Sequence, residues 1–261
     1  MFVFAAGACV GSFLNVVALR YHTGRSVMGR SACFSCGRML GVLDLVPVLS
    51  FLVSGGHCRY CGSSVSLQYP FVEAGTGLLF LALYLFGFPL AHGLYLAAGL
   101  SLLMVIIVYD LKHKIIPDLF VYAFAVLAAL SFFFNFETLR FVPPAPGHVL
   151  AGPLFFAPFF LLWLVSRGRW LGLGDGKLAW GIGWLLGLSQ GAAALLLSVW
   201  IGAAASVALL VGQRALSRSG ARLTMKSEVP FAPFLILGLL IALFFNVDFS
   251  DILSFFAPPQ P

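Results

Sequence analysis

The stretch LAWGIGWLLGLSQGAAALLLSVWIGAAASVALLVGQ, residues 178–213, contains 36 residues and no Asp, Glu, Lys or Arg. As one straight helix it would be about 54 Å long, nearly twice the hydrocarbon thickness of a bilayer, about 30 Å. It therefore has to fold back on itself, and GLSQG at residues 187–191 is the natural turn. This predicts a short membrane span that starts near Gly172 and a longer span from about 191 to 212.

The composition of the whole chain also indicates a membrane protein. Of its 261 residues, 61% are hydrophobic and 9% are charged, and the mean hydropathy is +1.03. A soluble domain carries about 25% charged residues, so soluble and disordered classes are excluded. Further apolar runs fall at 2–19, 71–91, 93–109, 119–136, 149–165 and 231–247. Together with the folded-back stretch, they predict an all-α polytopic membrane protein with about eight transmembrane helices.

The basic residues predict the orientation of these spans, because Lys and Arg concentrate in cytoplasmic loops. If the segment after the first span is cytoplasmic, 14 of the 15 basic residues fall inside and only Arg140 falls outside. The inside residues are Arg20, Arg25, Arg30, Arg38, Arg59, Lys112, Lys114, Arg167, Arg169, Lys177, Arg214, Arg218, Arg222 and Lys226. Topology thus explains the net charge of +6, and no nucleic-acid partner is expected. We expect the first span to be retained rather than cleaved as a signal peptide, since no basic region precedes it.

Four of the five cysteines form two pairs in the one long polar loop, residues 20–70. The pairs are Cys33-Phe-Ser-Cys36 and Cys58-Arg-Tyr-Cys61. Each spacing lets two thiolates reach one tetrahedral ion, and two pairs complete a four-sulfur site. Structural zinc is favoured, while an iron centre and two disulfides stay open, although disulfides are rare in a reducing cytoplasm. Cys9, inside an apolar run, is expected to be a packing residue.

Two of the nine acidic residues are predicted to carry chemistry. Asp110 follows an apolar run and is expected at a helix C-terminus, where a negative charge is unfavourable unless Lys112 and Lys114 compensate it. Asp175 lies in GLGDGK, residues 172–177, whose glycines allow close approach of another chain. An ionisable residue at membrane depth is costly and is therefore a functional candidate. The chain is predicted to cross the membrane twice between these aspartates, so both are expected at the cytoplasmic boundary. If they lie close together there, one carboxylate can act as general base and the other as general acid, which is the chemistry of aspartyl proteolysis.

The other acidic residues receive structural interpretations. Asp118, beside Pro117, and Glu73, after Tyr69-Pro70, are expected in first helical turns, where a carboxylate favours the positive end of the helix dipole. A solvated role is expected for Asp44, Glu137, Glu228, Asp248 and Asp251. On composition and spacing alone, proton-coupled transport and structural pairing remain alternatives to proteolysis.

The order of these motifs resembles the type IV prepilin peptidases, a family of GxGD membrane aspartyl proteases. Nearly the whole chain takes part in the resemblance. The matching segments are 11–17, the cysteine pairs with 47–50 between them, Tyr69-Pro70 with Glu73, 109–118, 172–178 and 229–234. One departure is Phe34, which stands where the first cysteine pair commonly has proline.

The resemblance implies the reaction and the residues that perform it. Asp110 and Asp175 would be the catalytic pair, and Cys33, Cys36, Cys58 and Cys61 would bind structural zinc. The enzyme would lie in a bacterial inner membrane, surrounded by lipid, and would cleave the basic leader of type IV prepilins or type II secretion pseudopilins after a glycine, at the cytoplasmic face. Family members often also methylate the new N-terminus with S-adenosylmethionine, although the residues indicate no Rossmann-type cofactor site.

The same resemblance implies three parts: a first transmembrane helix at 1–19, a cytoplasmic zinc-binding loop at 20–70 and a transmembrane protease core at 71–261. Two other classes of function stay open. A proton- or metal-linked transporter needs a polar path, but the outer halves of the spans contain almost no ionisable groups. A noncatalytic assembly subunit of a pilus machine would dock through the zinc loop and would tolerate loss of both aspartates.

Overall fold

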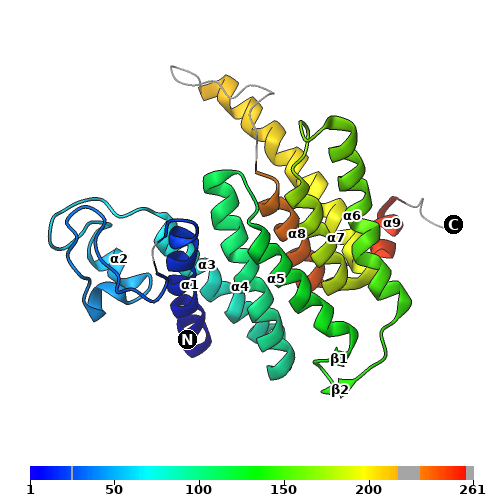
Figure 1. Cartoon of the computed structure of the whole chain (residues 1–261), viewed down its shortest axis with the longest axis horizontal. Helices are drawn as coiled ribbons and strands as arrows, with labels where there is room; N and C mark the ends of the chain where they lie inside the picture. The colour runs from blue at the N-terminus through cyan, green and yellow to red at the C-terminus, as the bar shows by residue number, and fades with distance from the viewer. Residues whose placement is uncertain (25, 217–229, 257–261) are drawn as a thin grey trace. The chain divides into compact units, whose positions relative to one another are not determined.

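The structure is a computed structural model that describes residues 1–24, 26–216 and 230–256. Its elements, in chain order, are α1 (Phe2–Arg20), η1 (Val42–Leu45), α2 (Leu49–Val53), α3 (Gln68–Leu85), α4 (Leu90–His113), α5 (Asp118–Ala129), η2 (Leu130–Phe132), β1 (Phe134–Asn135), β2 (Arg140–Phe141), α6 (Pro146–Ser166), α7 (Leu173–Leu216), α8 (Ala232–Phe245) and α9 (Phe249–Phe256) (Figure 1). The chain forms two compact units, Met1–Val108 and Tyr109–Pro261, and the sequence boundary between them falls within α4. Arg25, Arg218, Arg222, Lys226, Glu228 and Val229, which the sequence analysis used, lie outside the described residues.

The predicted helical membrane architecture is confirmed in its coarse form. Among the described residues, four helices are long and apolar enough to cross a membrane: Phe2–Arg20, Leu90–His113, Pro146–Ser166 and Leu173–Leu209. Two further apolar helices, Asp118–Phe132 and Ala232–Phe245, are shorter. The count of eight spans stays a prediction.

The predicted turn in the long apolar stretch lies where the glycines indicated. Gly187 has φ 77° and ψ −170°, which interrupts the helical backbone of α7. A β-carbon added at Gly183 would lie 2.6 Å from the ring of Phe155, and one added at Gly191 would lie 2.5 Å from the same ring. Eight residues of straight helix span about 12 Å, so one ring could not touch both positions. The chain therefore doubles back at Gly187.

The first unit is built on a close pairing of α1 with α3. A β-carbon at Gly11 would lie 2.9 Å from the Cα atom of Glu73, and one at Gly77 would lie 2.8 Å from the ring of Phe4. These glycines let the two backbones approach where side chains would separate them. Helix α3 ends at Leu85, earlier than the predicted 91, because Gly87 adopts φ 76°.

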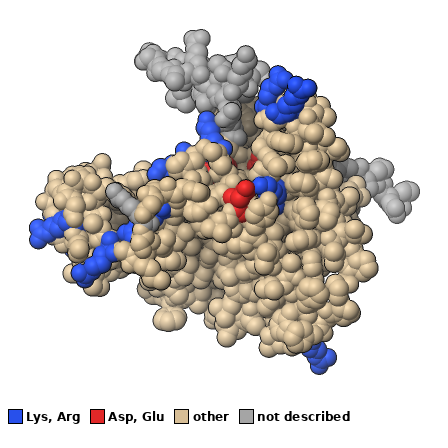
Figure 2. All heavy atoms as spheres, in the orientation of Figure 1, with Lys and Arg blue, Asp and Glu red and all other residues tan. Residues whose placement is uncertain are grey.

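The second unit packs α5, α6 and α8 around α7. The predicted helix 119–136 stops at Phe132, because Asn135 accepts hydrogen bonds from the backbone N–H groups of Glu137 and Thr138 and so forms the turn of a β1–β2 ribbon. Basic side chains of this unit show at the end where α6 joins α7, and another shows at the ribbon (Figure 2). This agrees with the predicted separation of Arg140, in the ribbon, from the other basic residues.

The tightest helix contact in the second unit predicts a strong substitution effect. A β-carbon at Gly238 in α8 would lie 2.2 Å from the carbonyl oxygen of Ala194 in α7, a backbone atom that cannot turn aside. Gly238→Ala should therefore lower the free energy of unfolding by about 2–3 kcal/mol, measured by thermal unfolding in detergent micelles. Gly93→Ala is the matched control, since its nearest neighbours lie 3.9 Å away, and it should leave stability unchanged or slightly raised. Equal stability of the two variants would contradict the helix contact.

Candidate functional site

The four paired cysteines converge on one point in the first unit. The sulfur atoms of Cys33, Cys36, Cys58 and Cys61 all lie within 4.8 Å of one another, and the cysteines are not joined as disulfides. The Sγ atoms of Cys33 and Cys61 are 3.8 Å apart. A tetrahedral ion with metal–sulfur bonds of about 2.3 Å requires sulfurs about 3.8 Å apart. The donor set and its spacing therefore fit a four-coordinate metal ion.

Each cysteine pair is built on the same backbone turn. The N–H of Gly37 donates to the carbonyl oxygen of Cys33, and the N–H of Gly62 donates to that of Cys58, both at 2.9 Å. Both glycines have positive φ, 70° and 72°, a backbone conformation that residues with a side chain rarely adopt. The repeated Cys-x-x-Cys-Gly spacing is the sequence signal for this turn.

The turns also favour the thiolate form that metal ions bind. The backbone N–H groups of Cys36 and Ser35 lower the pKa of Cys33 to about 6. The hydroxyl and backbone N–H of Ser63 lower the pKa of Cys61. At Cys36 the backbone N–H of Arg38 acts in the same direction, but burial and the adjacent thiols outweigh it and raise the pKa to about 11. Cys9, expected to be a packing residue, is instead exposed on α1.

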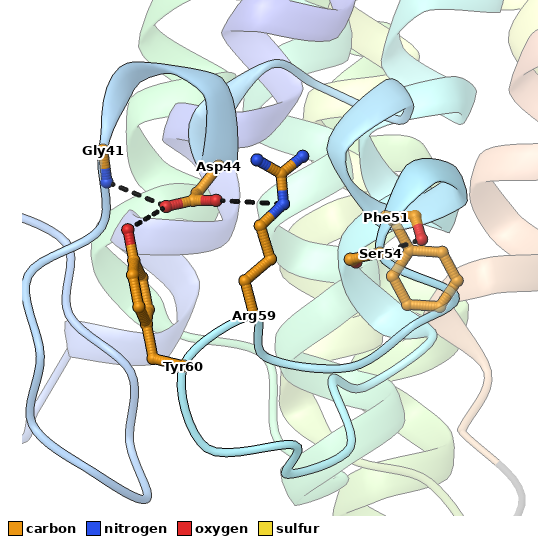
Figure 3. Close-up of polar contacts among 6 residues, drawn as sticks. All are labelled: Gly41, Asp44, Phe51, Ser54, Arg59 and Tyr60. Carbon is orange, nitrogen blue, oxygen red and sulfur yellow. Dashed lines mark hydrogen bonds and ion pairs between the residues drawn. The ribbon is translucent and has the colours of Figure 1, made fainter.

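Asp44 is not the solvated residue that the sequence suggested. Its side chain is 12% exposed and accepts hydrogen bonds from the Gly41 N–H at 3.0 Å and the Tyr60 hydroxyl at 3.1 Å (Figure 3). The Arg59 Nε atom lies 3.5 Å from the other carboxylate oxygen. Asp44 thus ties the segment after the first cysteine pair to the two residues inside the second pair.

Glu73 was expected in the first turn of a helix, but α3 begins five residues earlier, at Gln68. Glu73 is 7% exposed, and its Oε2 atom accepts a hydrogen bond from the backbone N–H of Val48 at 2.7 Å. Val48 has φ 63° and ψ −50°, a strained conformation for a β-branched residue. The carboxylate of Glu73 therefore fastens the cysteine loop to α3.

Asp110 is buried near the C-terminal end of α4, as the sequence predicted. It is 5% exposed, and the backbone N–H of Ala232, the first residue of α8, lies near its carboxylate and stabilises the charge. Lys112 and Lys114, which were expected to compensate its charge, are exposed. The backbone amide of Ala232, at the positive end of the α8 dipole, stabilises the Asp110 carboxylate in place of the two lysines. Within the described part of the chain, Asp110 Oδ2 is buried and has no hydrogen-bond partner.

Asp175 lies in the first turn of α7 and belongs to the same unit as Asp110. It is 9% exposed, and the backbone N–H of Gly172, in the segment directly before the helix, lies near its carboxylate and stabilises the charge. The two carboxylates are close enough for the charge of Asp110 to act on Asp175. Two neighbouring buried carboxylates, one with an unpaired oxygen, can divide the roles of acid and base in a hydrolysis.

The glycines around Asp175 have surroundings that differ from the sequence prediction, which was that they allow close approach of another chain. A β-carbon at Gly174 would lie 2.8 Å from the Cβ atom of Ile116, and one at Gly176 would lie 3.0 Å from the Cβ atom of Phe159. These two glycines admit neighbouring side chains of this chain rather than a substrate backbone. A β-carbon at Gly172 would lie 3.5 Å from the Asp175 carboxylate, an ordinary contact distance, so this position is the least crowded of the three.

Asp118 and Lys177 form an ion pair that the sequence analysis missed. The Nζ atom of Lys177 lies 2.5 Å from Asp118 Oδ1 and 5.0 Å above the ring of Tyr122. Asp118 is in the first turn of α5, as expected for a residue that favours the helix dipole. No local pattern indicates its partner, which is 59 residues away.

Comparison with known proteins assigns both units to described families. Residues 5–86 match the bacterial peptidase A24 N-terminal domain, and residues 97–207 match the type IV leader peptidase family. The chain is 34% identical to a prepilin leader peptidase/N-methyltransferase of Myxococcus xanthus, over 88% of this chain and 68% of that protein. It is 32% identical to the protein of the same name from Bacillus subtilis, over 97% and 96% of the two chains. No solved structure matches the chain.

The sulfur geometry predicts one metal ion per chain. Cys58→Ser should reduce the metal content from about one equivalent to below about 0.1, because a metal site loses most of its affinity without one thiolate of four. The measurement is elemental analysis of the purified full-length protein by mass spectrometry, which also identifies the metal. Cys9→Ser removes a thiol outside the cluster and should keep the full equivalent. Equal metal content in the two variants would contradict the site.

Proposed function

The chain belongs to the type IV leader peptidase family, and on that premise we propose that it is a membrane aspartic endopeptidase that cleaves the leader peptide from prepilins or pseudopilins. The observation that carries the proposal is the pair Asp110 and Asp175, two buried carboxylates whose charges interact within one unit. A noncatalytic subunit has no need of such a pair. Relatives that match almost the whole chain carry the peptidase name.

Asp110 and Asp175 are proposed as the catalytic residues. One carboxylate, ionised, takes a proton from water, and the resulting hydroxide attacks the scissile carbonyl carbon. The other, protonated, donates its proton to the carbonyl oxygen and forms a tetrahedral diol. When the C–N bond breaks, the first carboxyl gives the proton that it took from water to the leaving amine, and the second carboxylate recovers a proton from the diol, so the peptide bond and one water become a carboxylic acid and an amine. The unpaired oxygen of Asp110 and the absence of a close side-chain contact at Gly172 support access of water and of the substrate backbone to this pair.

Zinc is proposed as the metal of Cys33, Cys36, Cys58 and Cys61. Four thiolates at a tetrahedral spacing match structural zinc, and they leave no coordination position for substrate. The ion would contribute to folding of the loop rather than to hydrolysis, because few side chains of the loop are buried.

The organisation of the chain in the membrane is also a proposal. We assign residues 1–19 to the first transmembrane helix, 20–70 to a cytoplasmic zinc-binding loop and 71–261 to the protease core, with eight spans in a bacterial inner membrane. The distribution of Lys and Arg supports this orientation. Asp110 and Asp175 would then act at the cytoplasmic face, where the basic leader of a prepilin is found.

N-methylation of the newly exposed N-terminus, with S-adenosylmethionine as methyl donor, is the second proposed activity. Its support is the N-methyltransferase part of the relatives' names. Incubation of the protein with a prepilin and S-adenosylmethionine carrying a labelled methyl group should transfer label to the cleaved pilin. The Asp110→Asn variant should transfer none to uncleaved prepilin, whose N-terminal amine is still that of the leader.

Replacement of either aspartate tests the peptidase assignment. Asp110→Asn and Asp175→Asn should each lower the rate of prepilin cleavage by at least about 10³-fold, because an amide neither accepts nor donates the proton that hydrolysis moves. The rates are measured in proteoliposomes by the appearance of shortened pilin on gels. Glu137→Gln, on the exposed β1–β2 turn, is the matched control and should keep the full rate.

Normal processing by either aspartate variant would refute the catalytic pair. The thermal unfolding of each variant is measured in the same detergent. A variant that loses both cleavage and methylation and also melts at a lower temperature has a folding defect rather than a specific loss of catalysis.

A further inference from the structure

We propose that the ion pair of Lys177 with Asp118 holds Asp175 at its working distance from Asp110, which makes Lys177 and Asp118 positioning residues for hydrolysis. The inference rests on the proposed function, since it assigns the pair a role in that reaction. The side chain of Lys177 is 18% exposed and that of Asp118 is 64% exposed, so the ion pair lies at the surface of the second unit.

The cation of Lys177 is held by two successive turns of one helix. Its Nζ atom contacts Asp118, the first residue of α5, at 2.5 Å, and lies 5.0 Å from the ring centre of Tyr122, four residues further along. Residues four apart on a helix lie on one face, so both contacts come from the same side of α5. The contacts fix the first turn of α7 relative to the start of α5.

Each end of the ion pair is close in sequence to one of the two aspartates. Lys177 follows Asp175 by two residues within the same helical turn. Asp118 follows Asp110 by eight residues, and the connection begins with the Lys114 N–H donating to the Asp110 carbonyl oxygen at 2.7 Å. The ion pair therefore joins the segment that carries one carboxylate to the segment that carries the other.

A second contact joins the same two segments beside the ion pair. Gly174 lies so close to Ile116 that an added β-carbon would be 2.8 Å from the Cβ atom of Ile116. This contact blocks closer approach, whereas the ion pair resists separation. Together they define the spacing of the two segments from both directions.

The expected effect is on rate rather than on stability. An ion pair with one exposed partner adds little to the stability of a folded protein. Reacting groups, however, lose about 100-fold in rate when they are misplaced by about 1 Å. Lys177→Met and Asp118→Asn should thus lower kcat for prepilin cleavage by about 10- to 100-fold, while KM stays within about twofold and the melting temperature is unchanged.

The choice of asparagine separates this role from stabilisation of a helix start. Asparagine has the size of aspartate but no charge, and at the first residue of a helix the loss of the charge costs only a little stability. If Asp118 only stabilises the start of α5, Asp118→Asn keeps nearly full activity. If Asp118 holds Lys177, Asp118→Asn has a lower kcat. The double variant Lys177→Met/Asp118→Asn then has a kcat no lower than that of either single variant, because each single change already removes the same interaction.

The experiment measures kcat and KM of full-length variants in proteoliposomes with a prepilin. Lys177→Arg keeps the cation and should retain most of the rate, and Lys112→Met removes an exposed cation outside the pair and should retain all of it. Additive losses in the double variant, or a normal kcat in Asp118→Asn, would overturn the proposal.

A measurement without substrate keeps this test apart from the proposed function. Hydrogen–deuterium exchange should increase in residues 110–118 and 172–177 of Lys177→Met, with no change at the β1–β2 ribbon. If the unaltered protein cleaves no prepilin, the peptidase assignment fails, whereas unchanged exchange in Lys177→Met refutes the ion pair's structural effect whatever the activity is.

Discussion

A buried carboxylate among apolar helices requires a hydrogen-bond donor, and this requirement organises both units of the protein. A charged or polar group without a partner costs several kcal/mol in such surroundings. Three carboxylates of the described chain are less than one tenth exposed: Glu73, Asp110 and Asp175. Glu73 accepts a hydrogen bond from the backbone amide of Val48, and the backbone amides of Ala232 and Gly172 lie near the carboxylates of Asp110 and Asp175 and stabilise their charges. Within a helix almost all amides are already bonded, so these donors have to come from places where the helical pattern is open.

The positions of these amides explain motifs that otherwise look like irregular interruptions. Ala232 begins α8, where the first amides have no partner within the helix, and Gly172 directly precedes α7. Pro233, the second residue of α8, lacks an N–H that would have no helical partner there. The segments 172–177 and 230–234 therefore supply donors to the two aspartates, which links the start of two helices to the chemistry that we propose for them.

The sequence predicted the features that depend on local composition, and missed those that depend on distant partners. The fold-back at Gly187 was predictable because a charge-free stretch twice the bilayer thickness has to turn, and the cysteine cluster because its spacing matches tetrahedral coordination. The carboxylate roles were harder. Glu73 and Asp44 were assigned to a helix start and to solvent, yet they bond to Val48 and Tyr60. The periodicity of a sequence does not identify a partner on another segment. In the sequence alone, Gly174, which packs against Ile116, cannot be distinguished from a glycine that leaves room for a substrate.

The cysteine loop depends on its acidic residues because it has little apolar core of its own. Val42 and Leu43 are 84% and 70% exposed, so the loop has little apolar core of its own. Its shape depends on the cysteine cluster, on Asp44 across the two cysteine pairs and on Glu73, which holds the strained turn at Val48. A strained turn persists only where its surroundings hold it. A metal ion held by the cysteines and the attachment to α3 would therefore stabilise the same loop. Loss of either one would weaken the effect of the other, since together they offset the conformational entropy that the loop loses on folding.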